Sequence, residues 1–373
     1  MMKSLLRALS TGMLVTVAGL GALQASANVT LKNGHPEVYY VKQGDTLWDI
    51  SSRFLETPWQ WPELWHVNEE IDNPHLIYPG DVIRLVYVEG RPQLQVERRG
   101  GPAGGAPTDT VKMMTDGSVV RLSPEVRVLP LDAAIPTIPV STIQTFLRDA
   151  LVVTREEAAA APYVIAGGDR RVVFAQGDTI YARDPVQKWA ELIQSYGVFR
   201  VGHRYVDPQT KEVLGIEALK IGMLRTADQQ GDVATFRVIQ TQEDIRPQDR
   251  LFTSREGRMQ SIFYPSAPDT KVEARIIRFF DRLHSVARND VVVLNKGSRD
   301  GLRDGHVLEV MQAGQRIKDP VRKGMVQLPD VQAGTVVLFR VFEKVSYALV
   351  VQATLPIRMN DLATNPTGSL PEL

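Results

Sequence analysis

The stretch from residue 38 to residue 86 constrains this chain most, because it predicts four short elements around one small core. A short run of valine and tyrosine at 38–41, Val-Tyr-Tyr-Val, predicts a strand. A glycine-aspartate pair at 44–45 then turns the chain. A proline-glycine-aspartate turn at 79–81 precedes a second predicted strand at 82–87.

Two short helices are predicted between these strands. Thr46 suits a helix N-cap, because its hydroxyl can accept a hydrogen bond from the first helical turn. Leu47, Ile50 and Phe54 follow at helical spacing, which gives that helix one apolar face. Pro62 suits the first position of the second helix. The expected domain is therefore a small βααβ unit.

The two ends of this stretch carry a family resemblance. The segments QGDTLWDIS and NPHLIYPGDVIRL resemble the LysM domain, which binds glycans containing N-acetylglucosamine. The resemblance implies peptidoglycan as partner and a site made of two loops: Gly44, Asp45, Thr46 and Leu47 after the first strand, and Asn73, Pro74, His75, Leu76 and Ile77 before the second. An N-acetyl group presents an amide donor, an amide acceptor and a methyl group. Free backbone groups and a few apolar side chains can satisfy these, so we expect no cofactor.

The middle of the stretch is unusually aromatic, with Trp48, Trp59, Trp61 and Trp65. One interpretation is that some of these rings stack on sugar faces. The other is that they fill the core of a domain too small to be stable otherwise. We favour the core interpretation.

Residues 1–27 have the pattern of a secretory signal peptide. Lys3 and Arg7 precede an apolar run at 14–23, which is too short for a membrane span, and Ala25-Ser26-Ala27 suits a signal peptidase. The chain has no cysteine, so it holds neither a disulfide nor a thiolate metal site, and no lipid is attached through a cysteine. We expect an exported protein of the periplasm with no membrane span in its mature part.

The charge balance bears on possible partners. Lysine plus arginine and aspartate plus glutamate each number 43, so the formal net charge is zero. Nucleic-acid binders usually present a basic face, so we expect no nucleic-acid partner.

The remainder divides by composition. Glycine and proline dominate residues 98–107, which predicts a flexible linker over 89–110 that lets the first domain, at 28–88, search its surroundings. A β-rich middle domain at 111–260 and a β-rich C-terminal domain at 261–373 follow. Short apolar runs predict strands in both, at 119–128, 172–173, 236–239, 272–280, 291–294, 307–310 and 336–341.

Several local patterns refine this division. Helices are predicted at 141–147, with Ile143, Phe146 and Leu147 on one face, and from 184 to a closing glycine at 197. Residues 176–180 echo the first LysM loop but lack its closing partner, so they predict an ordinary turn. Residues 297–305 lack the lysine of a phosphate-binding loop. Their Asp300-Gly301 and Gly305 predict a β-hairpin between 291–294 and 307–310.

Catalytic motifs are scarce. None of the six histidines forms an H-x-H or H-E-x-x-H pair, and Ser-x-x-Lys and Gly-x-Ser-x-Gly are absent. Thiol catalysis is excluded, because there is no cysteine. A glycosidase needs two placed carboxylates, and 43 acidic residues leave that route open. We expect a protein that is not an enzyme.

The part beyond the linker carries a second resemblance. The segments RLSP at 121, PLDAAIPTIP at 130, APYV at 161 and FRVFEKVSYALV at 339 resemble the LysM protein that accompanies the outer-membrane secretin of type IV pili. That family's second half is similar to the C-terminal domain of a flagellar outer-ring protein, a small β-barrel. The resemblance implies an α+β chain that clamps a secretin ring to peptidoglycan. A LysM-targeted cell-wall hydrolase and a general envelope scaffold remain as alternatives.

Overall fold

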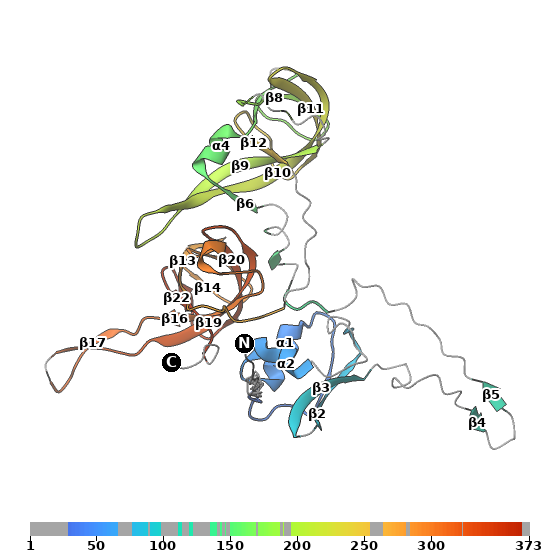
Figure 1. The fold of residues 1–373 in the computed structure, drawn as a ribbon, viewed down its shortest axis with the longest axis vertical. Coiled ribbons are helices and arrows are strands. Elements are labelled where there is room, and N and C mark those ends of the chain that lie inside the picture. The colour runs from blue at the N-terminus through green and yellow to red at the C-terminus, as the bar shows by residue number, and fades with distance from the viewer. Residues whose placement is uncertain are drawn as a thin grey trace, which may run out of the picture.

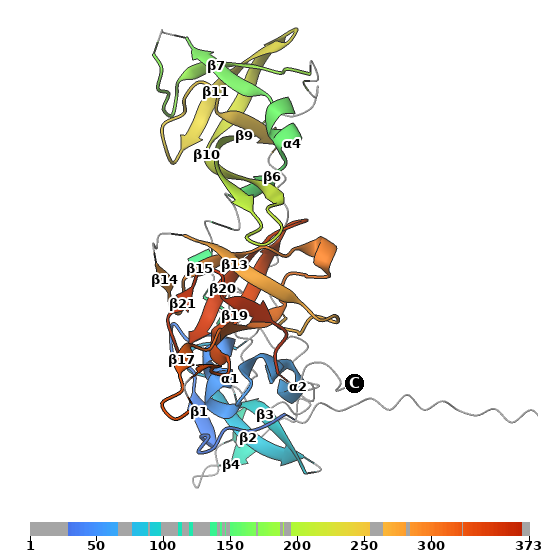
Figure 2. The same cartoon turned by 90° about the vertical axis from the view of Figure 1, so that its left-hand side faces the viewer.

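The computed structural model of this chain consists mostly of β-strands, grouped in three units. Figures 1 and 2 show the C-terminal unit between the first unit and the middle unit. The predicted signal peptide at 1–27 and residues 98–110 lie outside the described residues. The structure describes residues 29–65, 77–88, 90–97, 111–113, 119–121, 135–139, 142–143, 146, 150–168, 171–186, 189, 195–253, 264–280, 284–322 and 324–367.

The first unit has the predicted helices and strands. Its elements are β1 (Val38–Tyr40), α1 (Leu47–Phe54), the 3-10 helix η1 (Pro58–Gln60), α2 (Trp61–Trp65), β2 (Val82–Val88) and β3 (Arg91–Glu97). Proline begins η1 at position 58, whereas Pro62 is the second residue of α2. Leu47, Ile50 and Phe54 are buried on one face of α1, which confirms the predicted apolar face. Trp61 of α2 packs in the same core.

Strand β3 was not predicted, because its residues fall in the expected flexible linker. It pairs with β2 along its whole length, from Val82 opposite Glu97 to Val88 opposite Arg91. Leu94 of β3 is buried in the first unit's core. The expected linker is therefore wrong over 91–97. The alternation of glutamine with Leu94 and Val96 is the signal that composition concealed.

The middle unit is a curled antiparallel sheet. Its elements are β6 (Ala150–Val153), α4 (Arg155–Ala160), β7 (Tyr163–Gly167), β8 (Thr179–Arg183), β9 (Ser195–Val206), β10 (Val213–Gln230), β11 (Val233–Thr241) and β12 (Arg250–Thr253). The strand order is β11-β8-β7-β12-β9-β10-β6, and β11 pairs also with β10, so the sheet returns on itself. A separate pair, β4 (Val111–Met113) and β5 (Val119–Arg121), precedes it.

The helix predicted from 184 to a closing glycine at 197 is wrong wherever the structure describes it, because residues 184–186 and 189 are not helical and residues 195–197 begin β9. Tyr196 and Gly197 lie in β9, where they pair with both β10 and β12. Trp189 is buried in the core of the sheet. Two neighbouring strands thus override the local helix signal. Val172 and Val173 are exposed and lie outside any strand, so the strand predicted there is also wrong.

The C-terminal unit contains a closed barrel of six strands. Its elements are β13 (Glu273–Phe279), β14 (Ser285–Val286), β15 (Val291–Leu294), the 3-10 helix η3 (Ser298–Asp300), β16 (Val307–Gln312), β17 (Arg316–Lys318), β18 (Met325–Gln327), β19 (Val331–Val341), β20 (Ser346–Ala353), β21 (Ile357–Arg358) and β22 (Leu362–Thr364). The barrel order is β13-β15-β20-β19-β16-β22. The small β-barrel expected in this part of the chain is therefore confirmed.

The hairpin predicted between β15 and β16 is wrong. Strand β15 pairs with β13 and β20, while β16 pairs with β19 and β22. The intervening residues form η3, and Gly301 closes it in the left-handed region at φ 83°. The glycines therefore bend a connection between barrel strands that do not pair with each other.

One turn recurs through all three units. In each case a backbone N–H at position four donates to the carbonyl at position one, the third residue has positive φ, and the fourth residue is an aspartate. The aspartate carboxylate accepts in return from the N–H of position one, which locks the turn. These aspartates are Asp45, Asp81, Asp178, Asp249, Asp290 and Asp361. The turn predicted at 176–180 is one of them.

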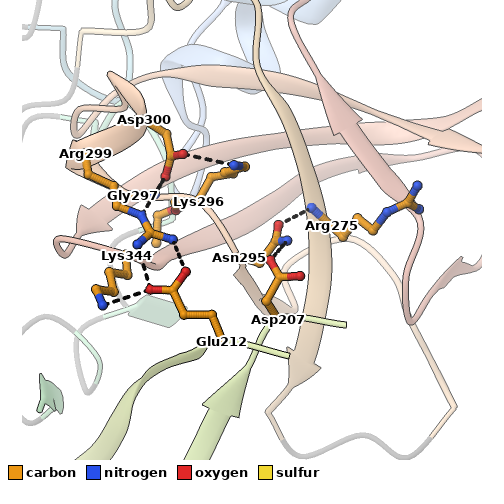
Figure 3. Close-up of polar contacts among 10 residues, drawn as sticks. Asp207, Glu212, Arg275, Asn295, Lys296, Gly297, Arg299, Asp300 and Lys344 are labelled. Atoms are coloured by element: carbon orange, nitrogen blue, oxygen red, sulfur yellow. Dashed lines mark hydrogen bonds and ion pairs between the residues drawn. The ribbon is translucent and has the colours of Figure 1, made fainter. Parts of the chain in front are cut away.

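Polar contacts join the β9–β10 hairpin to the barrel (Figure 3). The carboxylate of Glu212 accepts from the Arg299 guanidinium at 2.8 and 2.9 Å, and from Lys344 Nζ at 2.9 Å. Beside it, Asn295 Nδ2 donates to Asp207 at 2.7 Å. These contacts hold the middle unit against the barrel.

None of the helices within the described ranges has the length and apolar character of a membrane span.

Two buried tyrosines add to the contact between the middle unit and the barrel. The Tyr205 hydroxyl donates to Glu217 at 3.0 Å and lies 3.1 Å from the Tyr347 hydroxyl of β20. Burial and the neighbouring Tyr347 raise the pKa of Tyr205 far above its usual range. Both phenols therefore remain neutral hydrogen-bonding groups at any physiological pH.

Candidate functional site

The N-terminus of α1 is the centre of the predicted site. Thr46 is the N-cap: its hydroxyl oxygen accepts from the Asp49 N–H at 3.1 Å and donates to the Asp49 carboxylate at 2.8 Å. The Ile50 N–H donates to the Thr46 carbonyl. Since the first N–H groups of a helix have no partner within it, the N–H groups of Leu47 and Trp48 are left for another acceptor.

The loop before α1 is shaped by the recurrent turn. Gly44 is exposed at φ 90°, and a Cβ added there would meet no heavy atom within 4 Å. The Asp45 carboxylate accepts from the Lys42 N–H at 2.8 Å and from the Tyr39 hydroxyl at 2.9 Å. Burial and this hydrogen bond raise the pKa of Tyr39. Asp45 therefore shapes the loop and leaves ligand contact to the backbone.

The remaining predicted site residues have different outcomes. Leu47 and Ile77 are buried together in the core of the first unit, so their side chains hold the two loops in place. Thr46 is buried as well, in its role as helix cap. The predicted residues Asn73, Pro74, His75 and Leu76 lie outside the described residues.

A segment that sequence reasoning did not assign to the site connects its two loops. We call residues 135–139, Ile-Pro-Thr-Ile-Pro, the strap. The Leu47 N–H donates to the Pro136 carbonyl at 3.0 Å, and the Trp48 N–H donates to the Thr137 carbonyl at 3.1 Å. The Ile135 N–H donates to the Ile77 carbonyl at 2.8 Å. The orphan donors of a helix N-terminus were the sequence signal for such a partner.

The tryptophans of the first unit whose side chains the structure describes are buried or half-buried, but they do not share one core. Trp61 lies in the core of the first unit. Trp48 is 3% exposed and packs with barrel residues, and the half-buried Trp59 packs against the same cluster. The Trp65 side chain lies outside the described residues. Trp48 and Trp59 therefore dock the first unit on the barrel, which differs from the expectation of a freely searching domain.

A depression of about 650 Å³ adjoins the α1 N-terminus. Asp45 and Asp49 line it together with Arg53 and the barrel residue Arg288. Arg288 forms an ion pair with Asp49, and the Arg53 guanidinium lies 4.9 Å from the centre of the Tyr39 ring. Charges of both signs therefore line the depression. Across the described ranges, no cluster of three or more metal-ligating side chains occurs.

Comparison with known proteins identifies the class of the first unit. Residues 39–86 match the LysM domain family, so the chain contains a LysM domain, a carbohydrate-binding module. The chain is also similar to the uncharacterized protein YqbP of Bacillus subtilis (strain 168), with 35% identity over 60 residues. That match covers 13% of this chain and 27% of YqbP. The chain thus spans about a quarter of that relative, and the similarity extends to no more than a small part of either protein.

Proposed function

We propose that this chain is a non-catalytic, exported protein of the cell envelope that binds peptidoglycan in the periplasm. Its LysM domain would recognise N-acetylglucosamine-containing glycan strands. The observation that carries this proposal is the LysM match over 39–86, with two helix N–H groups at the centre of the predicted site. Two adjacent N–H donors suit the carbonyl of an N-acetyl group, and recognition of this kind requires no titrating residue.

The proposed cellular role is to anchor the outer-membrane secretin of a type IV pilus machine. The sequence segments that resemble the secretin-associated LysM protein support it, as does the small barrel that follows the LysM domain. One domain on one glycan is a shallow polar contact, which favours weak binding. A ring of many copies would gain about 10²–10⁴ in avidity, which would turn weak single sites into a firm hold on the wall.

A matched pair of glycine variants tests the glycan site. Gly44 and Gly177 occupy the same position of the recurrent turn, with φ of 90° and 91°, and both face open space. Gly44→Val and Gly177→Val therefore impose similar backbone strain, but only the first places a side chain at the predicted site. We expect Gly44→Val alone to reduce co-sedimentation with purified peptidoglycan sacculi. Equal retention of both variants would contradict the site assignment.

Charged substitutions at Thr46 or Ile77 would be poor tests, because both side chains are buried and the variants would unfold the domain. The cellular role needs a different experiment. We expect the secretin to dominate the proteins recovered with the tagged chain after cross-linking of whole envelopes. Recovery of wall proteins without secretin would favour a general scaffold, and release of muropeptides from sacculi would reveal a hydrolase.

A further inference from the structure

The strap is suited to bind as an extended peptide. Pro136 and Pro139 fix their own φ angles, and each restricts the preceding isoleucine to extended conformations. The segment therefore loses less conformational entropy on binding than an ordinary loop does. Pro136 also lacks an N–H, so it presents only its carbonyl, and that carbonyl accepts from the Leu47 N–H.

Two apolar cores hold the strap in place. Ile135 is 4% exposed and packs in the LysM core, while Ile138 is 1% exposed and packs in the cluster between the LysM domain and the barrel. Thr137 lies buried between them. The strap thus contacts both predicted loops of the LysM site through its backbone, and both neighbouring units through its side chains.

The backbone groups that the strap uses are those that a glycan would need. The N–H groups of Leu47 and Trp48 have no acceptor within α1, and two strap carbonyls accept from them. The carbonyl of an N-acetyl group is an amide acceptor of the same kind. The strap and a sugar therefore cannot use these donors at the same time.

We propose that the LysM site of this chain binds an extended polypeptide as well as glycan, with the strap as its resident ligand, so that glycan must displace the strap. This inference rests on the proposed glycan function for its second half. Because Ile138 and Trp48 belong to the same interface cluster, displacement also loosens the LysM domain from the barrel. Contact with the cell wall is thereby coupled to the arrangement of the units.

The coupling has a measurable size. A site that is available only a fraction of the time shows an apparent affinity reduced by that fraction. If the strap occupies the site for nine-tenths of the time, removing it raises the affinity for glycan about tenfold. The affinity of the strap-bound chain is thus a lower limit on what the LysM domain can achieve.

A reversible lock tests the exclusion in one molecule. The chain has no cysteine, so Ile77→Cys with Ile135→Cys creates the sole thiol pair. The hydrogen bond from the Ile135 N–H to the Ile77 carbonyl, and the core that the two side chains share, bring the pair close together, as a disulfide requires. We expect the oxidised variant to bind N-acetylchitotetraose at least about tenfold more weakly in calorimetry than the reduced variant. The parent chain, titrated with and without reductant, is the control.

Amide hydrogen exchange tests the same idea without new thiols. In the parent chain we expect the amides of Leu47, Trp48 and Ile135 to be protected, because each donates a hydrogen bond in the strap contacts. Saturating N-acetylchitotetraose should keep Leu47 and Trp48 protected while Ile135 becomes exposed to exchange. Ile135→Ala, which removes most of the strap's buried anchor without adding a charge to the core, should increase the exchange of the Leu47 and Trp48 amides in the absence of sugar and increase sugar affinity.

The outcomes separate the two proposals. Equal affinity of the oxidised and reduced variants, or sugar binding that leaves the Ile135 amide protected, overturns the exclusion and leaves the glycan function intact. Absence of sugar binding in both redox states overturns the glycan function instead. In that case the exchange of the Leu47 amide in Ile135→Ala tests the peptide-binding half of the proposal: lost protection supports a peptide-binding site, and unchanged protection overturns it.

Discussion

Replacing Trp48 with alanine should detach the LysM domain from the barrel without unfolding it. Trp48 lies on α1 but is 3% exposed because it packs with barrel residues. The opposite face of the same helix, with Leu47, Ile50 and Phe54, packs in the LysM core. The substitution therefore leaves that core complete and removes one of the two tryptophans from the interface.

The magnitude follows from the burial of this side chain. Truncation of a buried tryptophan to alanine costs about 3–5 kcal/mol. If the whole cost falls on docking, the equilibrium shifts toward the undocked form by a factor of about 10² to 4 × 10³, at 1.4 kcal/mol for each factor of ten. The ion pair between Arg288 and Asp49 is partly exposed and contributes little to offset this loss.

Small-angle X-ray scattering of the chain measures the outcome. We expect the radius of gyration of Trp48→Ala to increase, while the amide spectrum of the LysM domain keeps its native dispersion. Trp189→Ala is the matched control, because it truncates a buried tryptophan in the middle unit, away from this interface. A radius unchanged from the parent in Trp48→Ala would show that the tryptophan does not hold the two units together.

Three further substitutions probe contacts elsewhere in the chain. Hydrogen bonds from Arg299 and a lysine lower the pKa of Glu212 from 4.5 to about 2, so this carboxylate stabilises the fold above pH 4.5 and loses that contribution as the pH falls toward 2. The melting temperature of Glu212→Gln should therefore fall less steeply over this range than that of the parent. Asp249→Ala removes the lock of one recurrent turn and the partner of an arginine on β9, and denaturant titration should show a loss of about 2–3 kcal/mol. Gly305→Ala should lower the melting temperature more than Gly177→Ala does. Both glycines have φ near 90°, but only a Cβ added at Gly305 would lie 2.6 Å from a backbone oxygen. Equal decreases in melting temperature would mean that the backbone near Gly305 moves aside.

Local interactions account for what could be predicted from the amino-acid sequence. The Thr46 cap, the apolar face of α1 and the turn at Gly44 depend on residues within a few positions of one another. The LysM domain was recognisable because both of its ends lie in one short stretch of the chain. Burial of Leu47 and Trp61 likewise follows from a core that neighbouring residues build.

Contacts between distant residues account for what could not be predicted. The sequence of a strand predicts that the segment pairs, but it does not identify the partner strand. The segments of β15 and β16 therefore predicted a hairpin, although each of them pairs with other strands of the barrel. Pairing with β10 and β12 likewise made a strand of Tyr196 and Gly197, against a local helix signal. Backbone donors are the same in every sequence. The strap becomes the partner of the α1 N-terminus because the folded LysM domain and the barrel bury Ile135 and Ile138 beside it. These two residues lie more than fifty positions along the chain from the residues of the site.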